Sequence, residues 1–270
     1  MKIFAPTYQR DEQGRVLFPS RDTELRNSLF TYTDATEHVA RCNMIMIKEV
    51  VDFVSEPGET ILDPFAGTGT ILVAVTMGRK VICIELETPF QNMIASNIKA
   101  MRVSFPDIDE VTNLIPGDCT KLLPIPNIAN HAIFSPPWAQ TLRKKSVDDF
   151  GKDMGYGSAE KYTASMNNVG NLSDFIYHQV MEKFYKRLFQ SITPGGTITI
   201  IIKDRMEAGK RIRYGARAKR DCLRIGFEPV AWNRWLALGG GFAAYNRSIG
   251  LDTVNEEDLI TLRKPIKEEE

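Results

Sequence analysis

A glycine-rich turn between an apolar segment and a helical segment constrains this chain more than any other feature. Residues 60–63 have the pattern of a short buried strand. The run that follows is Asp63-Pro64-Phe65-Ala66-Gly67-Thr68-Gly69-Thr70. Glycines placed there let the backbone approach a ligand closely before a helix begins. A dinucleotide fingerprint would need a third glycine where this chain has Leu72, and a Walker loop would need Gly-Lys-Ser/Thr, so both are disfavoured.

Strands and helices alternate along the rest of the chain. Apolar residues at helical spacing predict a helix within 38–54, ahead of the turn. Beyond the turn we expect, in order, helix 71–77, strand 80–85, helix 89–102, strands 113–116 and 132–134, helix 174–192 with Ser173 as its N-cap, strand 197–202, helix 214–225 and strand 227–231. This alternation predicts an α/β fold with a doubly wound, mostly parallel sheet.

Acidic residues end three successive predicted strands. Asp63 ends the first, Glu85 the second, and Asp118 closely follows the third. An acid at the end of the second strand can accept both hydroxyls of a ribose. Asp118 could meet an adenine amino group. Singly, Glu85 and Asp118 could equally be helix caps or solvated acids, but the repetition favours a cofactor site.

The segment Ser135-Pro136-Pro137-Trp138 follows an apolar strand, at the edge where open α/β sheets bind ligands. The two prolines fix φ and remove two backbone donors, which leaves a rigid rim of acceptors. Such a rim suits an NH2 group that must be held and aimed. Trp138 offers a face on which an extruded base can stack. The alternative is a proline-rich turn with a core tryptophan. The position of the motif after the glycine turn counts against this alternative.

The glycine turn followed by Ser135-Pro136-Pro137-Trp138 resembles the amino-methylating DNA methyltransferases, the N4-cytosine/N6-adenine family, over about residues 36–230. The resemblance implies a Rossmann-like class I S-adenosylmethionine-dependent methyltransferase fold, with S-adenosyl-L-methionine as cofactor. The implied catalytic residues are Ser135, Pro136, Pro137 and Trp138. The implied cofactor-binding residues are His38, Asp63, Pro64, Phe65, Ala66, Gly67, Thr68, Gly69, Thr70, Glu85, Leu86, Asp118 and Cys119.

The resemblance also indicates which base is methylated. In the family, a motif that begins with serine goes mostly with N4 of cytosine, and one that begins with Asp or Asn goes with N6 of adenine. We therefore expect a flipped cytosine in DNA, with adenine N6 or an RNA base as the alternative. Methylation of a protein amide and a catalytically silent cofactor- and nucleic-acid-binding subunit also stay open. No Pro-Cys nucleophile is present, which disfavours C5 methylation. The family often has His-Pro where this chain has His38-Val39.

Basic residues gather in 203–224 and, directly after the Ser135 motif, in a second cluster. Phosphate contacts from such segments supply affinity that does not depend on sequence. A solvated helix face is the other explanation. The candidate nucleic-acid contacts are Arg143, Lys144, Lys145, Lys203, Arg205, Lys210, Arg211 and Arg213. The expected partner is double-stranded DNA.

Residues 1–35 are expected to form an N-terminal arm, 36–265 a single methyltransferase domain with an insertion or loop at about 139–171, and 266–270 a disordered tail. Segment 232–245 is predicted to form the last hairpin of the sheet, and a loop that probes the base is the alternative. The sequence leaves open the target sequence, a homodimer, and a cognate nuclease of a restriction-modification pair.

Composition narrows the remaining classes. No apolar run approaches the roughly 20 residues that span a bilayer. The N-terminus lacks the pattern of a signal peptide, so we expect a cytoplasmic protein with no membrane partner. Four scattered cysteines and three histidines argue against a disulfide framework and a metal site.

Overall fold

The structure, a computed structural model, describes residues 2–19, 21–30, 42–139, 168–207, 209–236, 248, 250 and 254–266. Within these ranges, seven strands form one sheet in the order β3-β2-β1-β4-β5-β9-β8. Neighbouring strands among β1 to β5 pair in parallel, whereas β9 is antiparallel to both β5 and β8. The strands are β1 Thr60–Asp63, β2 Lys80–Glu85, β3 Thr112–Pro116, β4 Ala129–Phe134, β5 Ile192–Ile202, β8 Glu228–Leu236 and β9 Glu256–Arg263. The predicted doubly wound, mostly parallel sheet is confirmed.

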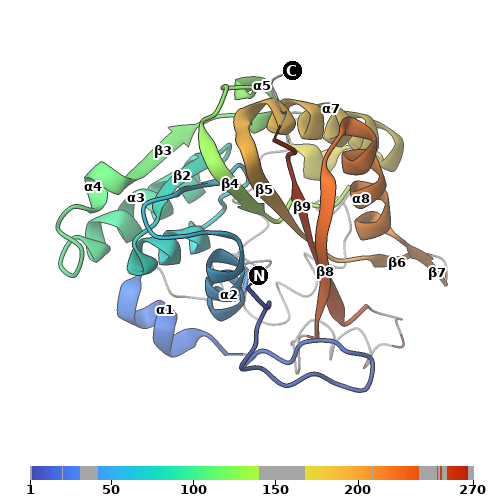
Figure 1. The fold of residues 1–270 in the computed structure, drawn as a ribbon, viewed down its shortest axis with the longest axis horizontal. Coiled ribbons are helices and arrows are strands. Elements are labelled where there is room, and N and C mark those ends of the chain that lie inside the picture. Colours follow the sequence, from blue (N-terminus) through green and yellow to red (C-terminus); the bar gives the residue numbers. More distant parts are fainter. Residues whose placement is uncertain are drawn as a thin grey trace.

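Helices cover both faces of this sheet (Figure 1). One core layer lies under α2, η2 and α3, and the other under α7 and α8. Ile61 of β1 faces the first layer, and its neighbour Leu62 faces the second. Strands buried on both faces need such uninterrupted apolar runs. The helical segments are α1 Thr23–Leu29, α2 Met44–Val54, η2 Thr70–Met77, α3 Thr88–Met101, α4 Ile108–Val111, α5 Cys119–Leu122, η4 Val169–Asn171, α7 Asp174–Ser191 and α8 Tyr214–Ile225. Two short strands, β6 Arg205–Glu207 and β7 Lys210–Ile212, pair separately as an antiparallel hairpin.

Three of the expected elements are present but differ in detail. Segment 70–77 is a 3-10 helix. At the start of α7, Ser173 is the N-cap residue but its side chain makes no cap hydrogen bond. Strand β5 begins five residues earlier than expected, with a register shift against β4. Gly196 is required at this irregularity, because a Cβ there would collide with the carbonyl oxygen of Asn130.

Most of the hairpin expected within 232–245 lies outside the described residues. Strand β8 ends at Leu236, and the strand that pairs with it is β9, Glu256–Arg263. β9 inserts between β8 and β5, so its position depends on two distant partners. A local sequence pattern cannot predict this pairing, because the paired strands are far apart in the sequence.

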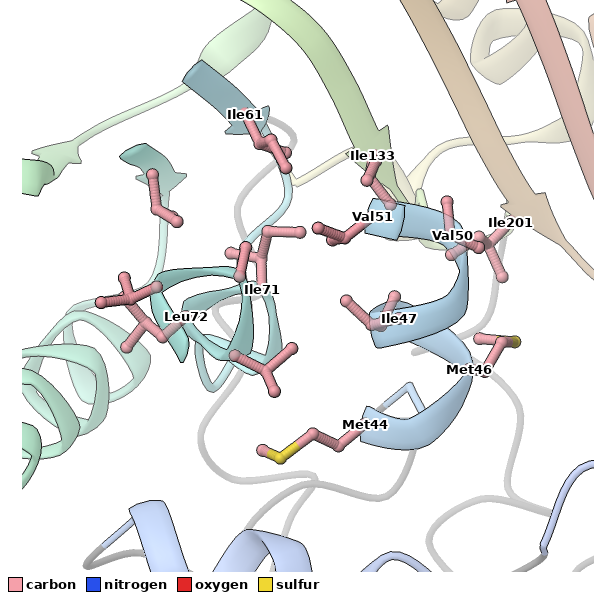
Figure 2. Close-up of a cluster of buried hydrophobic side chains, with 14 of the residues drawn as sticks. Met44, Met46, Ile47, Val50, Val51, Ile61, Ile71, Leu72, Ile133 and Ile201 are labelled. Atoms are coloured by element: carbon pink, nitrogen blue, oxygen red, sulfur yellow. The ribbon is translucent and has the colours of Figure 1, made fainter. Parts of the chain in front are cut away.

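The helix ahead of the glycine turn packs tightly onto the sheet. Asn43 caps α2, because its side-chain oxygen accepts the N–H groups of Ile45 and Met46. The apolar face of α2 meets η2, and residues from β1, β4 and β5 complete the cluster (Figure 2). The N-terminal segment joins the same layer through Phe4, Val16 and Phe18, which are almost fully buried.

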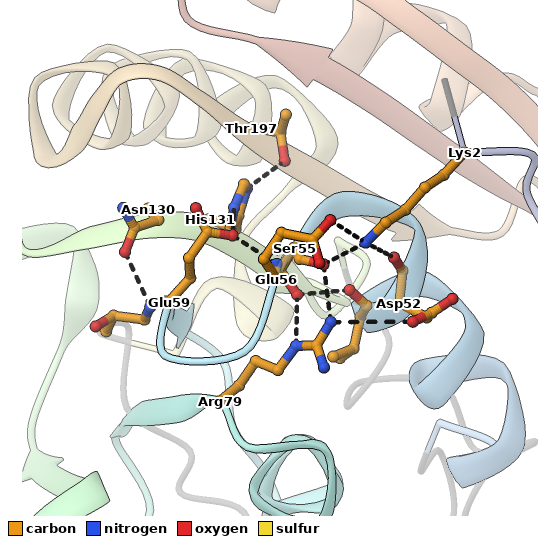
Figure 3. Close-up of polar contacts among 11 residues, drawn as sticks. Lys2, Asp52, Ser55, Glu56, Glu59, Arg79, Asn130, His131 and Thr197 are labelled. Carbon is orange, nitrogen blue, oxygen red and sulfur yellow. Dashed lines mark hydrogen bonds and ion pairs between the residues drawn. The ribbon is translucent and has the colours of Figure 1, made fainter.

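Polar contacts connect the amino ends of the strands to the end of α2 (Figure 3). The buried Arg79 donates from Nη2 to the carbonyl of Ser55 at 2.8 Å and from Nε to its hydroxyl at 3.1 Å. His131 lies between Thr197, at 2.9 Å, and Glu59, at 3.1 Å. Burial lowers the pKa of His131, and the Glu59 carboxylate opposes that shift. These contacts fix the strands from the edge away from the glycine turn.

The packing of α2 is tested by Ile47→Ala. Ile47 is 3% exposed, so its truncation removes buried apolar contact and leaves a cavity. Urea denaturation should give a loss of about 2–5 kcal/mol in the free energy of unfolding. The matched control is Asp52→Asn on the exposed face of α2, which should change it by no more than about 0.5 kcal/mol. Equal effects of the two substitutions would contradict the packing described.

Candidate active site

The glycine turn leaves β1 at the carboxyl edge of the sheet. The Asp63 carboxylate accepts the backbone N–H of Phe65 at 3.0 Å, which starts the turn. Gly67 and Gly69 have φ values of 53° and 79°, in the left-handed region that favours glycine. A Cβ at Gly69 would also lie 3.0 Å from a side-chain carbon of Ile94 on α3. The two glycines therefore set the conformation of the turn and its close fit against α3.

Glu85 joins this turn to the end of β2. One carboxylate oxygen accepts the Gly67 N–H at 2.6 Å, and the other accepts the Glu87 N–H at 2.8 Å. The residue is only 7% exposed. An ionised carboxylate offers about four lone-pair positions, so two remain for a ligand. The glycine turn and Glu85 are therefore in direct contact.

The two carboxylates are costly to ionise where they lie. Burial raises the pKa of Asp63 to about 7; the Phe65 N–H opposes this shift, and the charge of Glu85 adds to it. Burial raises the pKa of Glu85 to about 7 as well, against the stabilising N–H donors of Glu87 and Gly67. Both groups therefore change charge near neutral pH.

Asp118 has the role of a helix cap. Its Oδ1 accepts the N–H and the hydroxyl of Thr120, at 2.9 Å and 2.7 Å, at the start of α5. Its Oδ2 lies 3.3 Å from Lys121 Nζ. Gly117 links the ends of β3 and β2 by donating its N–H to the Glu85 carbonyl at 2.8 Å. Asp118 and the buried Cys119 thus lie at the same sheet edge, with the Asp118 carboxylate used by the protein itself.

Ser135-Pro136-Pro137-Trp138 leaves β4 next to the glycine turn. Strands β1 and β4 pair with Leu62 opposite Ala132, so the end of β1 lies beside the end of β4. Pro136 is buried, Ser135 and Trp138 are half-buried, and Trp138 packs against the second core layer. Burial raises the pKa of the Cys42 thiol, and the nearby Ser135 side chain opposes this shift. Cys42 precedes α2, so the start of this helix lies near the motif.

A buried arginine from the N-terminal segment connects these parts. Arg26 of α1 is 1% exposed and pairs with Asp22 at 2.7 Å. It donates to the carbonyl of Cys42 at 3.0 Å, and its Nη1 lies 3.4 Å from the hydroxyl of Thr70. Sequence reasoning missed Arg26 and Cys42. Their region is polar and irregular, and no motif marks a side chain that reaches the turn from 44 residues away.

The chain that leaves the Ser135 motif is held by Arg205. Its guanidinium donates to the carbonyl of Ala139 at 3.0 Å and to Asp174 at 2.6 Å. The Tyr214 hydroxyl donates to the other oxygen of Asp174 at 2.5 Å. The side chain of Arg205 is 15% exposed, so little of it faces solvent. These two contacts fix the chain directly after the motif.

The other basic residues predicted to contact nucleic acid differ in whether their charge is already paired within the protein. Lys210, Arg211 and Arg213 are all exposed, but Arg211 also pairs with Asp204 and Glu256, each at 2.8 Å. Burial lowers the pKa of Lys203, and Glu257 and Glu256 oppose this shift. The remaining predicted residues fall outside the described residues: His38, Arg143, Lys144 and Lys145.

No helix among the described residues is long and apolar enough to cross a membrane. Within the same ranges, no three His, Cys, Asp or Glu side chains are grouped so that they could hold a metal ion.

The two raised pKa values predict how stability depends on pH. Asp63 and Glu85 hold protons up to about pH 7 in the folded chain, whereas their ordinary pKa values are near 4. The folded state therefore binds more protons between about pH 4 and 7. The free energy of unfolding should fall as pH rises through this window.

Urea denaturation of the ligand-free protein at several pH values measures this slope. Asp63→Asn should flatten it, because one titrating carboxyl is gone and the other loses its repulsive neighbour. Glu110→Gln is the control, since Glu110 is exposed at the far end of the sheet and should leave the slope unchanged. A slope that is the same in both variants would mean that Asp63 ionises normally.

Known proteins resemble the chain in two ways. Residues 7–96, about a third of the chain, match the N6/N4 DNA methylase family; the match covers the glycine turn and Glu85 and ends before Ser135. No curated protein sequence matches. The solved structure of the cyclase SpnF is 13% identical, with a TM-score of 0.55, and covers 88% of this chain and 87% of its own. The solved structure of geranyl diphosphate methyltransferase in complex with SAM is 10% identical, with a TM-score of 0.50. The match covers 82% of this chain and 85% of that one. Residues 7–96 are thus similar to a DNA methylase family model, and the chain shares its Rossmann-like fold with these two solved structures.

Proposed function

We propose that this protein transfers a methyl group from S-adenosyl-L-methionine to the exocyclic amine of a flipped base in DNA, and that the base is cytosine, methylated at N4. The observation that carries the proposal is the pairing of β1 with β4. This pairing brings the glycine turn and the Ser135 motif to adjacent positions at one sheet edge. The DNA methylase match over residues 7–96 supports DNA as the substrate class.

The residues at this edge fit the cofactor. Glu85 keeps lone pairs that can accept the two ribose hydroxyls, in addition to the N–H groups it already binds. The turn at Gly67 and Gly69 exposes backbone without side chains, so a ligand can approach closely. Bound S-adenosylmethionine supplies a methyl group that its sulfonium already activates. The protein is then left with binding and orientation.

Ser135 and the Pro136 carbonyl are proposed to hold the amino group. Each accepts one amino hydrogen, which draws the nitrogen lone pair out of conjugation with the ring. Transfer would form the N–CH3 bond as the S–CH3 bond breaks, S-adenosylhomocysteine would leave, and the proton lost from the nitrogen would pass to solvent. Trp138 is proposed to hold the flipped base by stacking, since its half-buried ring lies in the same motif. Positioning of this kind supplies much of the acceleration in reactions between two bound groups.

The choice of cytosine depends on the serine at the first position of the motif. It follows the correlation within the family that the sequence resembles. Adenine N6 is the alternative. The same experiment separates the two bases.

The test is transfer of label from methyl-tritiated S-adenosylmethionine to plasmid DNA, followed by digestion to nucleosides. We expect tritium in N4-methylcytosine. Label in N6-methyladenine would correct the base alone, whereas label in RNA or protein but not in DNA would contradict the function. Ser135→Ala should lower kcat about 100- to 1000-fold, the typical cost of removing one donor or acceptor that acts in the transition state. Cofactor affinity should stay the same, because Ser135 is proposed to contact the base.

Arg205 is proposed as a positioning residue, because it holds the carbonyl of Ala139 directly after the motif. Arg205→Lys keeps the charge but cannot keep both contacts, to Ala139 and Asp174. It should lower kcat by about 10- to 100-fold through misplacement of the motif. The salt dependence of DNA binding should not change.

The matched comparison is Lys210→Ala combined with Arg213→Ala, in which two exposed charges are removed from the same basic segment. That variant should flatten the dependence of DNA affinity on salt and leave kcat near the wild-type value. An Arg205→Lys protein with normal kcat would contradict the positioning role of Arg205.

A further inference from the structure

A groove lies on the edge strand of the sheet, away from the Ser135 motif. Two segments far apart in sequence form it: the N-terminal hairpin 10–16 and strand β8, which lie side by side (Figure 1). Val16 donates its N–H to the Arg234 carbonyl at 2.7 Å and accepts that of Leu236 at 3.0 Å. The volume is about 370 Å³, and the lining residues are Arg10, Gln13, Gly14, Trp232, Asn233 and Arg234.

Positive charge and an aromatic ring line this groove. Arg10 is exposed, and its hydrogen bonds to the carbonyls of Gly14 and Phe4, at 3.0 Å and 3.2 Å, orient its guanidinium without neutralising it. Arg234 is 49% exposed on the opposite wall, 3.5 Å from the buried Asp258. Trp232 is 40% exposed, and Lys219 lies over its ring at 4.7 Å. Guanidinium groups in this arrangement suit an oxyanion that stays partly hydrated, such as a backbone phosphate.

The groove lies level with the catalytic motif. Phe134 at the end of β4 pairs with Ile200, Ile202 pairs with Asp258, and Asp258 pairs with Arg234. Arg234 is therefore at the same sheet edge as Pro136. Strand β8 is three strands away from β4, which at about 4.8 Å per strand gives about 14 Å. A DNA duplex rises about 3.4 Å per base pair, so this distance corresponds to about four base pairs.

We propose that the groove between hairpin 10–16 and β8 binds a backbone phosphate of duplex DNA about four base pairs from the flipped base. This inference rests on the proposed function and assigns it a second anchoring point, contributed by the N-terminal hairpin. Because phosphates carry no sequence information, the groove sets the register of the duplex and not the choice of base. The exposed Lys210 and Arg213 are proposed to contact the duplex separately.

The experiment compares Arg10→Ala/Arg234→Ala with wild type. The dissociation constant of a random-sequence 30-base-pair duplex is measured by fluorescence anisotropy from low to moderate salt. The slope of log affinity against log salt should become shallower by about two, one for each lost phosphate contact. Affinity for S-adenosylmethionine, measured by calorimetry on the same preparations, should not change, which shows that the variant is folded.

Two further variants serve as controls. Arg10→Lys/Arg234→Lys should keep most of the salt slope, because the charges remain. Lys80→Ala/Lys99→Ala removes two exposed charges near β2 and α3, at the other end of the sheet, and should keep the wild-type slope. A wild-type slope in Arg10→Ala/Arg234→Ala, with DNA still methylated by the wild-type enzyme, would overturn the groove alone. A wild-type protein that neither binds nor methylates DNA would overturn the proposed function and the groove with it.

Phosphate position provides an independent readout. Once the methylated base is identified, phosphates of its duplex can be ethylated one at a time. Ethylation about four base pairs from that base should weaken binding of the wild type but not of Arg10→Ala/Arg234→Ala. Interference at that position of equal size in both proteins would place the contact on other residues.

Discussion

The rest of the structure depends on β1, a strand of four residues that hydrogen-bonds to β2 on one side and to β4 on the other. The chain must leave this strand through a turn that fits between two occupied neighbours. Glycine at positions 67 and 69 allows that turn, and the Glu85 carboxylate holds it against β2. The same strand order places the end of β4, and with it Ser135, on the other side of the turn. Cofactor binding and base binding are therefore proposed to meet at a single point of the sheet.

The site buries several ionisable groups, and ionising them there costs free energy. Asp63 and Glu85 are buried near each other, and the pKa of each is raised to about 7. Arg26 is a buried charge that its partner Asp22 compensates, and its Nε has no hydrogen-bond partner among the described residues. Buried charges contribute little net stability, but they favour one arrangement, because any other would leave them unpaired. Here that arrangement ties α1, the start of α2 and the glycine turn together.

Sequence reasoning succeeded where the signal is local. Strands β1 and β2 and helix α8 have the predicted bounds, because apolar runs, glycine and helix spacing are written in adjacent residues. It failed for β9, whose place between β5 and β8 depends on two long-range pairings. It also missed the contacts of Arg26 and Cys42. The guanidinium of Arg205, for which the sequence predicts a phosphate contact, binds Ala139 and Asp174 within the chain. A side chain's charge is visible in the sequence, but its partners are set by the fold.

The central claim is that the glycine turn and the Ser135 motif serve one reaction. A crystal structure of the protein with S-adenosylhomocysteine tests it most directly. The account predicts that the ribose hydroxyls are hydrogen-bonded to Glu85 and that the sulfur atom faces Ser135. A nucleoside bound away from Glu85, or a sulfur atom directed away from the motif, would contradict it.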